Sequence, residues 1–158
     1  MRRADRAVEG LENILAILDK CDVMRIGLSV ENKPYIVPMN FAYEVADETV
    51  LIYFHCALQG KKMDMISLNR NVCFEVDALH GISKGDVACG WSVGYESVMG
   101  EGEATVITDE RQKVRALDVL MKRHGYSGRP YYSPDALSAV SVLRISVTAM
   151  TGKRKSME

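Results

Sequence analysis

Alternating apolar side chains, in segments separated by short turns, are the feature that most restricts the fold of this chain. In residues 23–30 (VMRIGLSV) every second position is apolar, so one face of a strand carries Met24, Ile26, Leu28 and Val30. The turn ENKP then leads into a second such segment, residues 35–45 (YIVPMNFAYEV). Because a short turn leaves no room for the crossover that parallel neighbours need, this pattern predicts antiparallel pairing.

The rest of the chain adds further strands and three helices. Strands are expected at residues 50–55, 71–79, 95–108 and 139–150. Helices are expected at residues 10–20 and at residues 60–69, the second with Leu68 turned inward. A third helix is expected to begin after a Thr108 cap and to end before Gly125. Residues 81–91 and 125–135 are expected to be loops. Pro38 predicts an edge position or a bulge, because proline cannot donate to a strand ladder. Gly100 and Gly102 share a face of their strand and predict a close approach to the backbone there.

These segments predict a mainly β fold with flanking helices. About six antiparallel strands without an edge-protecting device favour a closed or partly closed barrel. The length of 158 residues fits one domain covering residues 1–158, with an N-terminal helix at about residues 10–20. The basic segment 152–158 is expected to be a solvated tail.

Composition excludes several classes of function. The net charge of −1, from 20 basic and 21 acidic residues, argues against a general polyanion or nucleic-acid binder. Four widely spaced cysteines without a C-x-x-C pair argue against a disulfide framework and a structural zinc site. The charged N-terminus is not followed by an apolar stretch long enough for a signal peptide or a membrane span, so we expect a cytoplasmic protein with no metal site.

The first candidate site is the turn Gly60, Lys61 and Lys62. A turn glycine exposes backbone amides, and the first turn of a helix presents unpaired donors with a partial positive charge. The two lysines add full charges, so the turn is suited to hold a phosphate. The alternative is a solvated corner, although lysine at a helix start is unfavourable without an anion.

Two further segments lie near this turn in the sequence. His55, five residues before Gly60, could transfer a proton near neutral pH, or could be a half-buried histidine bonded to a carbonyl. Residues 37–41 (VPMNF) form a strand with one polar side chain, Asn40, and could offer backbone amides to a planar heterocycle. The alternative for this segment is a plain edge strand. No Walker A, GxGxxG, HExxH or GxSxG pattern is present.

Five segments in order carry a resemblance to a known family. They are YIVPMNFAYE, LIYFHCALQGKKMDMI, NRNVCFEVD, YESVMGEGEATVITDE and RISVTAMTGKRK. Over nearly the whole chain, their order and spacing resemble the nitroimidazole-resistance (Nim-type) branch of the pyridoxamine 5′-phosphate oxidase-like flavoproteins.

The resemblance implies a split β-barrel that binds FMN at the interface of a homodimer. It implies that the strand at residues 38–41 lies along the flavin ring, that the Gly60 turn holds the phosphate, and that His55 faces the flavin. A strand around Tyr95 would come from the second subunit and help to cover the ring. The implied cofactor-binding residues are Pro38, Met39, Asn40, Phe41, His55, Cys56, Gly60, Lys61, Lys62, Trp91, Tyr95 and Ser97.

The chain also departs from the oxidases that name the family. They carry Ser-Arg-Lys at the Gly60 turn and end in a segment with tryptophan and arginine, whereas no tryptophan follows Trp91 here. Vitamin B6 oxidation is therefore not expected. Lysine in place of arginine replaces a bidentate fork by a point charge, which predicts a modest FMN affinity.

Two hypotheses of different classes remain. The first is an FMN-dependent oxidoreductase that reduces small electron-poor compounds such as nitroimidazoles, with His55 as its catalytic residue and NAD(P)H or a partner as electron donor. The second is a non-catalytic flavin- or haem-binding protein of the same fold, in which Met39, His55 or Cys56 would be offered to the iron.

Overall fold

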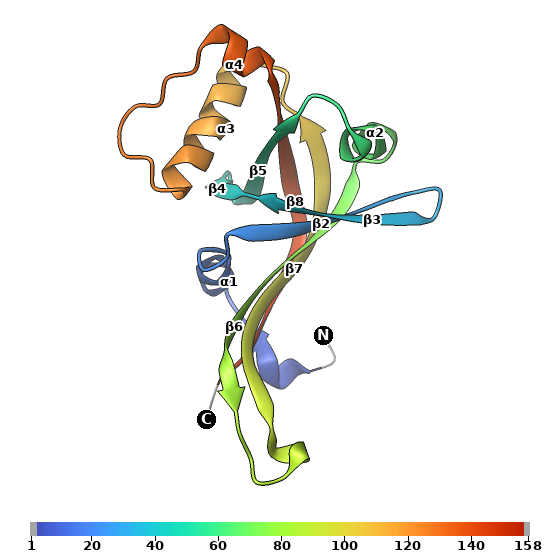
Figure 1. Ribbon diagram of the computed structural model, residues 1–158, viewed down its shortest axis with the longest axis vertical. Coiled ribbons are helices and arrows are strands. Elements are labelled where there is room, and N and C mark those ends of the chain that lie inside the picture. Colours follow the sequence, from blue (N-terminus) through green and yellow to red (C-terminus); the bar gives the residue numbers. More distant parts are fainter. Residues whose placement is uncertain (1–2, 157–158) are drawn as a thin grey trace.

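The computed structural model describes residues 3–156, in which one antiparallel sheet curves around a core and is flanked by helices (Figure 1). Its strands are β1 (Ala7–Val8), β2 (Val23–Val30), β3 (Lys33–Asn40), β4 (Ala42–Ala46), β5 (Thr49–Ala57), β6 (Asn71–Ser83), β7 (Ser92–Val106) and β8 (Val140–Lys155). Its α-helices are α1 (Leu11–Leu18), α2 (Lys61–Leu68), α3 (Glu110–Arg123) and α4 (Pro134–Ser138).

The sheet is an open path and not a closed cylinder. The strand order is β3-β2-β6-β7-β8-β5-β4, with β1 paired to β8 and every pairing antiparallel. The antiparallel split barrel predicted from the sequence is thereby confirmed, with eight strands in place of about six. The additional strands are β1 and the separate β4.

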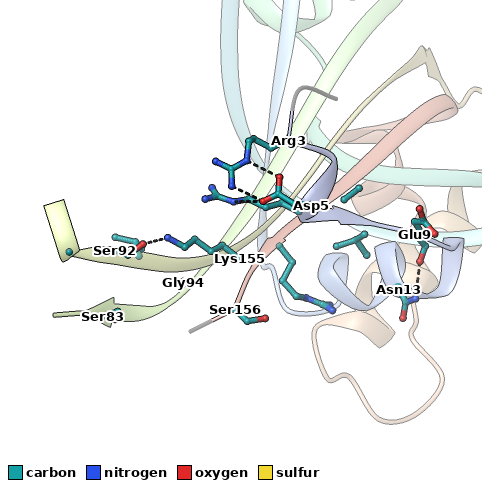
Figure 2. A pocket seen from close by; sticks show the side chains of 15 residues that line it. Arg3, Asp5, Glu9, Asn13, Ser83, Ser92, Gly94, Lys155 and Ser156 are labelled. Carbon is teal, nitrogen blue, oxygen red and sulfur yellow. Dashed lines mark hydrogen bonds and ion pairs between the residues drawn. The ribbon is translucent and has the colours of Figure 1, made fainter. Parts of the chain in front are cut away.

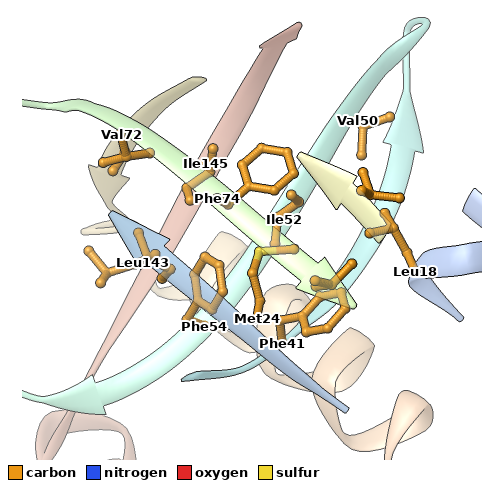
Figure 3. Packing of buried hydrophobic residues seen from close by; sticks show 14 of the residues in the cluster. Leu18, Met24, Phe41, Val50, Ile52, Phe54, Val72, Phe74, Leu143 and Ile145 are labelled. Carbon is orange, nitrogen blue, oxygen red and sulfur yellow. The ribbon is translucent and has the colours of Figure 1, made fainter. Parts of the chain in front are cut away.

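The hydrophobic core lies inside the curve of the sheet. Phe41, Phe54 and Phe74 are each at most 1% exposed and pack with aliphatic residues of β5 and β8 (Figure 3). The apolar face of α1 supplies Ile17 and Leu18 to the same cluster. On the outer side of β5, a second cluster joins Tyr53 to α3. No helix among residues 3–156 is long and apolar enough to span a membrane.

Several predicted boundaries were wrong. The segment 35–45 forms two strands, β3 and β4, because Phe41 leaves the ladder to enter the core. Residues 81–83 continue β6, and the predicted loop 125–135 ends two residues early, because α4 begins at Pro134. Helix α3 is capped by Asp109, whose carboxylate accepts from the Gln112 amide, and not by Thr108. Leu68 is 74% exposed and does not face inward.

The basic segment near the C-terminus is the largest correction. Strand β8 continues through Lys155, pairing with β7 from Tyr95 onward, so residues 152–155 are not a solvated tail. Gly152 makes this possible because a Cβ there would meet Val8 at 2.9 Å and Ile14 at 3.1 Å. Residues 157 and 158 of the expected tail lie outside the described residues.

The close approach expected at Gly100 and Gly102 is present. A Cβ on Gly100 would overlap the ring of Phe74, and one on Gly102 would overlap the backbone of Ser146. Pro38 lies on the edge strand β3, opposite Arg25, and the β2–β3 register runs past it without a bulge.

Candidate cofactor site

Helix α2 begins at a glycine turn. Gly60 has φ of 135°, in the region that favours glycine, and its carbonyl accepts from the amides of Met63 (2.8 Å) and Asp64 (3.1 Å). No side chain from residues 3–156 caps this helix end. The amides of Lys61 and Lys62 precede the first intrahelical bonds, so the turn presents donors of the kind that hold an oxyanion.

The two lysines differ in their surroundings. Lys61 is exposed and its ammonium lies 4.3 Å from the centroid of the Tyr35 ring on β3. Lys62 is half-buried and close to Cys56. Burial raises the pKa of the Cys56 thiol, and the positive charge of Lys62 opposes that rise. Within residues 3–156, no carboxylate lies within ion-pair distance of either lysine. Their charges are therefore available to an anion.

His55 and Cys56 lie on opposite faces of β5. His55 is exposed, pairs with Val142 of β8 and shares its face with Tyr53. No hydrogen bond fixes its ring among the described residues, which disfavours the half-buried histidine bonded to a carbonyl. Cys56 is buried, and its thiol lies 3.7 Å from the Met63 sulfur, so its side chain helps to seat α2 on the core.

The edge strand β3 presents its backbone as well as its side chains. Pro38 and Asn40 are exposed, whereas Met39 packs against the core and Phe41 is fully buried. The Asn40 amide donates to the Asp22 carbonyl at 3.1 Å and so ties the end of β3 to the start of β2. Phe41 is held by Arg123, whose guanidinium lies 4.6 Å from its ring centroid. Its side chain thus has a core role.

The remaining predicted residues lie in another part of the molecule. Trp91, which is 52% exposed, precedes β7, while Tyr95 and Ser97 are half-buried along the hairpin of β6 and β7. This hairpin projects from the body that carries β3, β5 and α2 (Figure 1). Within a single chain, the predicted residues therefore lie in two separate sets, one near α2 and one on the projecting hairpin.

One large hollow is lined by none of the predicted residues. It has a volume of about 890 Å³ and lies where the N-terminal segment meets the ends of β7 and β8, lined by residues such as Arg6, Arg154 and Lys155 (Figure 2). Sequence reasoning missed it because the basic segment was assigned to a tail.

Glu96 was also missed. Its side chain is 3% exposed and accepts from Lys20 (2.6 Å), His80 (2.8 Å) and Arg154. Burial alone would raise the pKa of this carboxyl, but the three donors lower it to about 2. The sequence contained an indication that Glu96 is buried, because strand alternation places it on the same inward face as Val98.

These features define the class of protein to which the chain belongs: a split β-barrel whose edge strand and lysine turn could hold a phosphorylated planar cofactor. The family model described as pyridoxamine 5′-phosphate oxidase matches residues 11–154, and the chain belongs to this family. The resemblance seen in the sequence is thus confirmed, and its nitroimidazole-resistance branch is supported by a solved relative.

That relative is a proposed 5-nitroimidazole antibiotic resistance protein from Bacteroides thetaiotaomicron. It is 33% identical, with a TM-score of 0.80 over 94% of this chain and 86% of its own. A flavocytochrome from Azotobacter vinelandii (22% identity, TM-score 0.83, 99% and 72% covered) shares the fold. So does an FAD- and haem-binding protein from Mycobacterium smegmatis (20% identity, TM-score 0.83, 96% and 74% covered). No curated protein sequence matches the chain significantly.

Proposed function

We propose that the protein binds FMN at the interface of a homodimer and is an FMN-dependent oxidoreductase for small electron-poor compounds. Nitroimidazole-type nitro compounds are the candidate substrates, with NAD(P)H or a partner protein as the source of electrons. The 33% identical Bacteroides protein supports this choice, because its name concerns resistance to 5-nitroimidazoles.

The α2 turn is the observation that carries the proposal. It combines a glycine at φ 135°, free helix-terminal amides, and two lysines without a carboxylate partner in the described part of the chain. This arrangement fits the phosphate of FMN, because a phosphate can accept from the amides and neutralise both ammonium groups. The contact of Lys61 with Tyr35 joins the turn to β3, whose backbone would lie along the flavin.

The distribution of exposed apolar side chains supports a dimer. An apolar hollow of about 530 Å³ crosses the outer face of β2, β3 and β6, and at its rim Ile36 is 67% and Met99 61% exposed. Leu79 and Ile82 on the projecting hairpin are 72% and 59% exposed. Exposed apolar side chains of this kind are typical of a subunit interface. A second copy would also bring Trp91, Tyr95 and Ser97 over the flavin ring, as the family resemblance implies.

The roles of the protein side chains follow from these positions. Bound FMN would supply the electron transfer, while the protein orients it and excludes water. His55 is exposed and free of hydrogen bonds in residues 3–156, so its ring can turn toward a ligand and give a proton to a reduced substrate. Lys61 and Lys62 anchor the cofactor and take no part in proton transfer.

The test compares FMN with riboflavin, which lacks the phosphate. The double variant Lys61→Ala/Lys62→Ala should bind FMN about 10- to 100-fold more weakly, as measured by quenching of FMN fluorescence. Each charged hydrogen bond contributes about 1.5–3 kcal/mol, and solvent screening at an exposed site reduces this contribution. Riboflavin affinity should not change. The matched control is Lys33→Ala, since Lys33 is exposed on β3.

Absorbance then tests the reaction. Purified protein should show flavin bands that bleach when NADH or NADPH is added without oxygen and return when a nitroimidazole is added. A double lysine variant with full FMN affinity would contradict the phosphate site. A Soret band in place of flavin bands would contradict the cofactor assignment.

A further inference from the structure

Two adjoining hollows lie where the N-terminal segment, the outer part of β6 and β7, and the end of β8 meet. The larger is the 890 Å³ hollow of Figure 2, and the smaller has a volume of about 570 Å³. They share Arg154 and Ser156 in their linings. We call the two together the terminal cleft.

The terminal cleft carries a surplus of positive charge. Among the described residues, five cationic side chains line it against three carboxylates, which leaves an excess of two positive charges in a chain whose net charge is −1. The cations are Arg3, Arg6, Lys20, Arg154 and Lys155, and the carboxylates are Asp5, Glu9 and Glu96. The sign of this local charge favours an anionic ligand.

The cations differ in how far they are already paired. Arg3 is held by both oxygens of Asp5, at 2.8 and 2.6 Å, so its charge is neutralised. Lys155 donates to the hydroxyl of Ser92, and over residues 3–156 no carboxylate lies within ion-pair distance of it. Arg6 approaches Asp5 only through its Nε at 3.9 Å. Arg6 and Lys155 therefore keep most of their capacity for a ligand.

Glu96 forms the floor of the smaller hollow and orients Arg154. Its buried carboxylate binds Arg154 through Nε, and within residues 3–156 the two terminal nitrogens of that guanidinium have no hydrogen-bond partner and can bind a ligand. Lys20, in the turn after α1, and His80 on β6 hold the carboxylate. Arg154 thus lies on the shared wall of the cleft with its direction fixed by a rigid neighbour.

Tyr95 connects the terminal cleft to the proposed flavin site. Arg6, in the lining, donates to the Tyr95 hydroxyl at 3.3 Å. This bond, with a smaller effect of Lys153, lowers the pKa of the tyrosine, as expected in a positive environment. Tyr95 belongs to the set on the hairpin that a second subunit would place against the flavin.

We propose that the terminal cleft binds the pyrophosphate of a reduced nicotinamide dinucleotide, through Arg6, Arg154 and Lys155. The proposal rests on the proposed function, which needs an electron donor whose ring reaches the flavin. A pyrophosphate diester is a dianion and matches the surplus charge of the cleft. Its position beside Tyr95 would leave the nicotinamide end next to the flavin site, and the chain has no GxGxxG motif to bind the dinucleotide elsewhere.

The experiment is a calorimetric titration of the FMN-loaded protein with NAD⁺ and NADP⁺, the oxidised forms, so that binding is measured without turnover. The variant Arg6→Gln/Lys155→Gln should bind at least one of them about tenfold more weakly, because two charged hydrogen-bond donors are lost. Arg111→Gln is the control, because Arg111 is exposed on α3, away from the terminal cleft. FMN affinity is measured in the same samples: it should be equal in the wild type and Arg111→Gln, and any change in the double variant reports the lost bond from Arg6 to Tyr95.

The outcomes separate this proposal from the proposed function. Dinucleotide affinity that is unchanged in the double variant, or absent in the wild type, would overturn the assignment of the cleft. Equal affinity for ADP and for inorganic phosphate would also overturn it, since the cleft would then recognise an anion alone. A wild type that binds a dinucleotide but not FMN would overturn the proposed function while supporting the cleft.

Discussion

The ammonium of Lys61 lies over the ring of Tyr35, 4.3 Å from its centroid, and so joins the first turn of α2 to the edge strand β3. These elements are far apart in sequence but adjacent in the proposed FMN site. The contact restricts a long side chain that would otherwise sample many rotamers. It therefore prepares the lysine for a phosphate before any ligand is bound.

Tyr35→Leu should weaken FMN binding by about 2- to 5-fold, because a cation–π contact at an exposed site contributes about 0.5–1 kcal/mol. Riboflavin binding should be unaffected, and both affinities can be read from flavin fluorescence. Tyr131→Leu is a suitable control, since Tyr131 is 85% exposed. Equal losses for FMN and riboflavin would mean that Tyr35 contacts the ring and not the phosphate anchor.

His55→Ala should lower kcat for a nitro substrate by about 10²- to 10⁴-fold, the usual effect of removing a proton donor. FMN affinity and the thermal unfolding temperature should stay near the wild-type values, because the side chain is exposed and has no hydrogen bond in residues 3–156. His124→Ala, at the C-terminal end of α3, provides the control. Unchanged turnover in His55→Ala would exclude the catalytic role.

The sequence predicted the strands well because their chemistry is local. The alternation in residues 23–30 defines β2 with both boundaries correct, and the edge position of Pro38 follows from its missing amide proton. The turn at Gly60 could be predicted in the same way, since glycine, lysine pair and helix are neighbours in the chain. The resemblance then added the pairing of this turn with a flavin phosphate.

What the sequence did not predict depends on contacts between distant segments. Residues 152–155 have the composition of a tail and become a strand only because β7 and β1 pair with them on either side. The partners of Glu96 come from the turn after α1, from β6 and from β8, so no spacing rule indicates them. The terminal cleft arises from the same long-range pairing.

Gly100→Ala should destabilise the fold by about 1–3 kcal/mol, the usual cost of overpacking a core. The new Cβ would overlap the ring of Phe74 and lie 2.8 Å from the Ala149 carbonyl oxygen. Phe74→Leu in the same chain should recover part of this loss, and urea unfolding of the single and double variants measures the coupling. Additive losses would show that the backbone contact, and not the ring, sets the cost.

Glu96→Gln should destabilise the protein by roughly 2 kcal/mol at neutral pH. This loss is smaller than the loss expected for a fully buried ion pair, because the partners of Glu96 are partly exposed. The folded-state pKa of about 2 lies below the ordinary 4.5, so this contribution is present above pH 4.5 and is lost as the pH falls toward 2. Urea unfolding of wild type and variant from pH 7 to pH 3 should therefore show curves that converge in acid. Glu101→Gln, on the same strand and exposed, should follow the wild type throughout. A gap between wild type and Glu96→Gln that stays constant down to pH 3 would mean that Glu96 stabilises the fold by its shape and not by its charge.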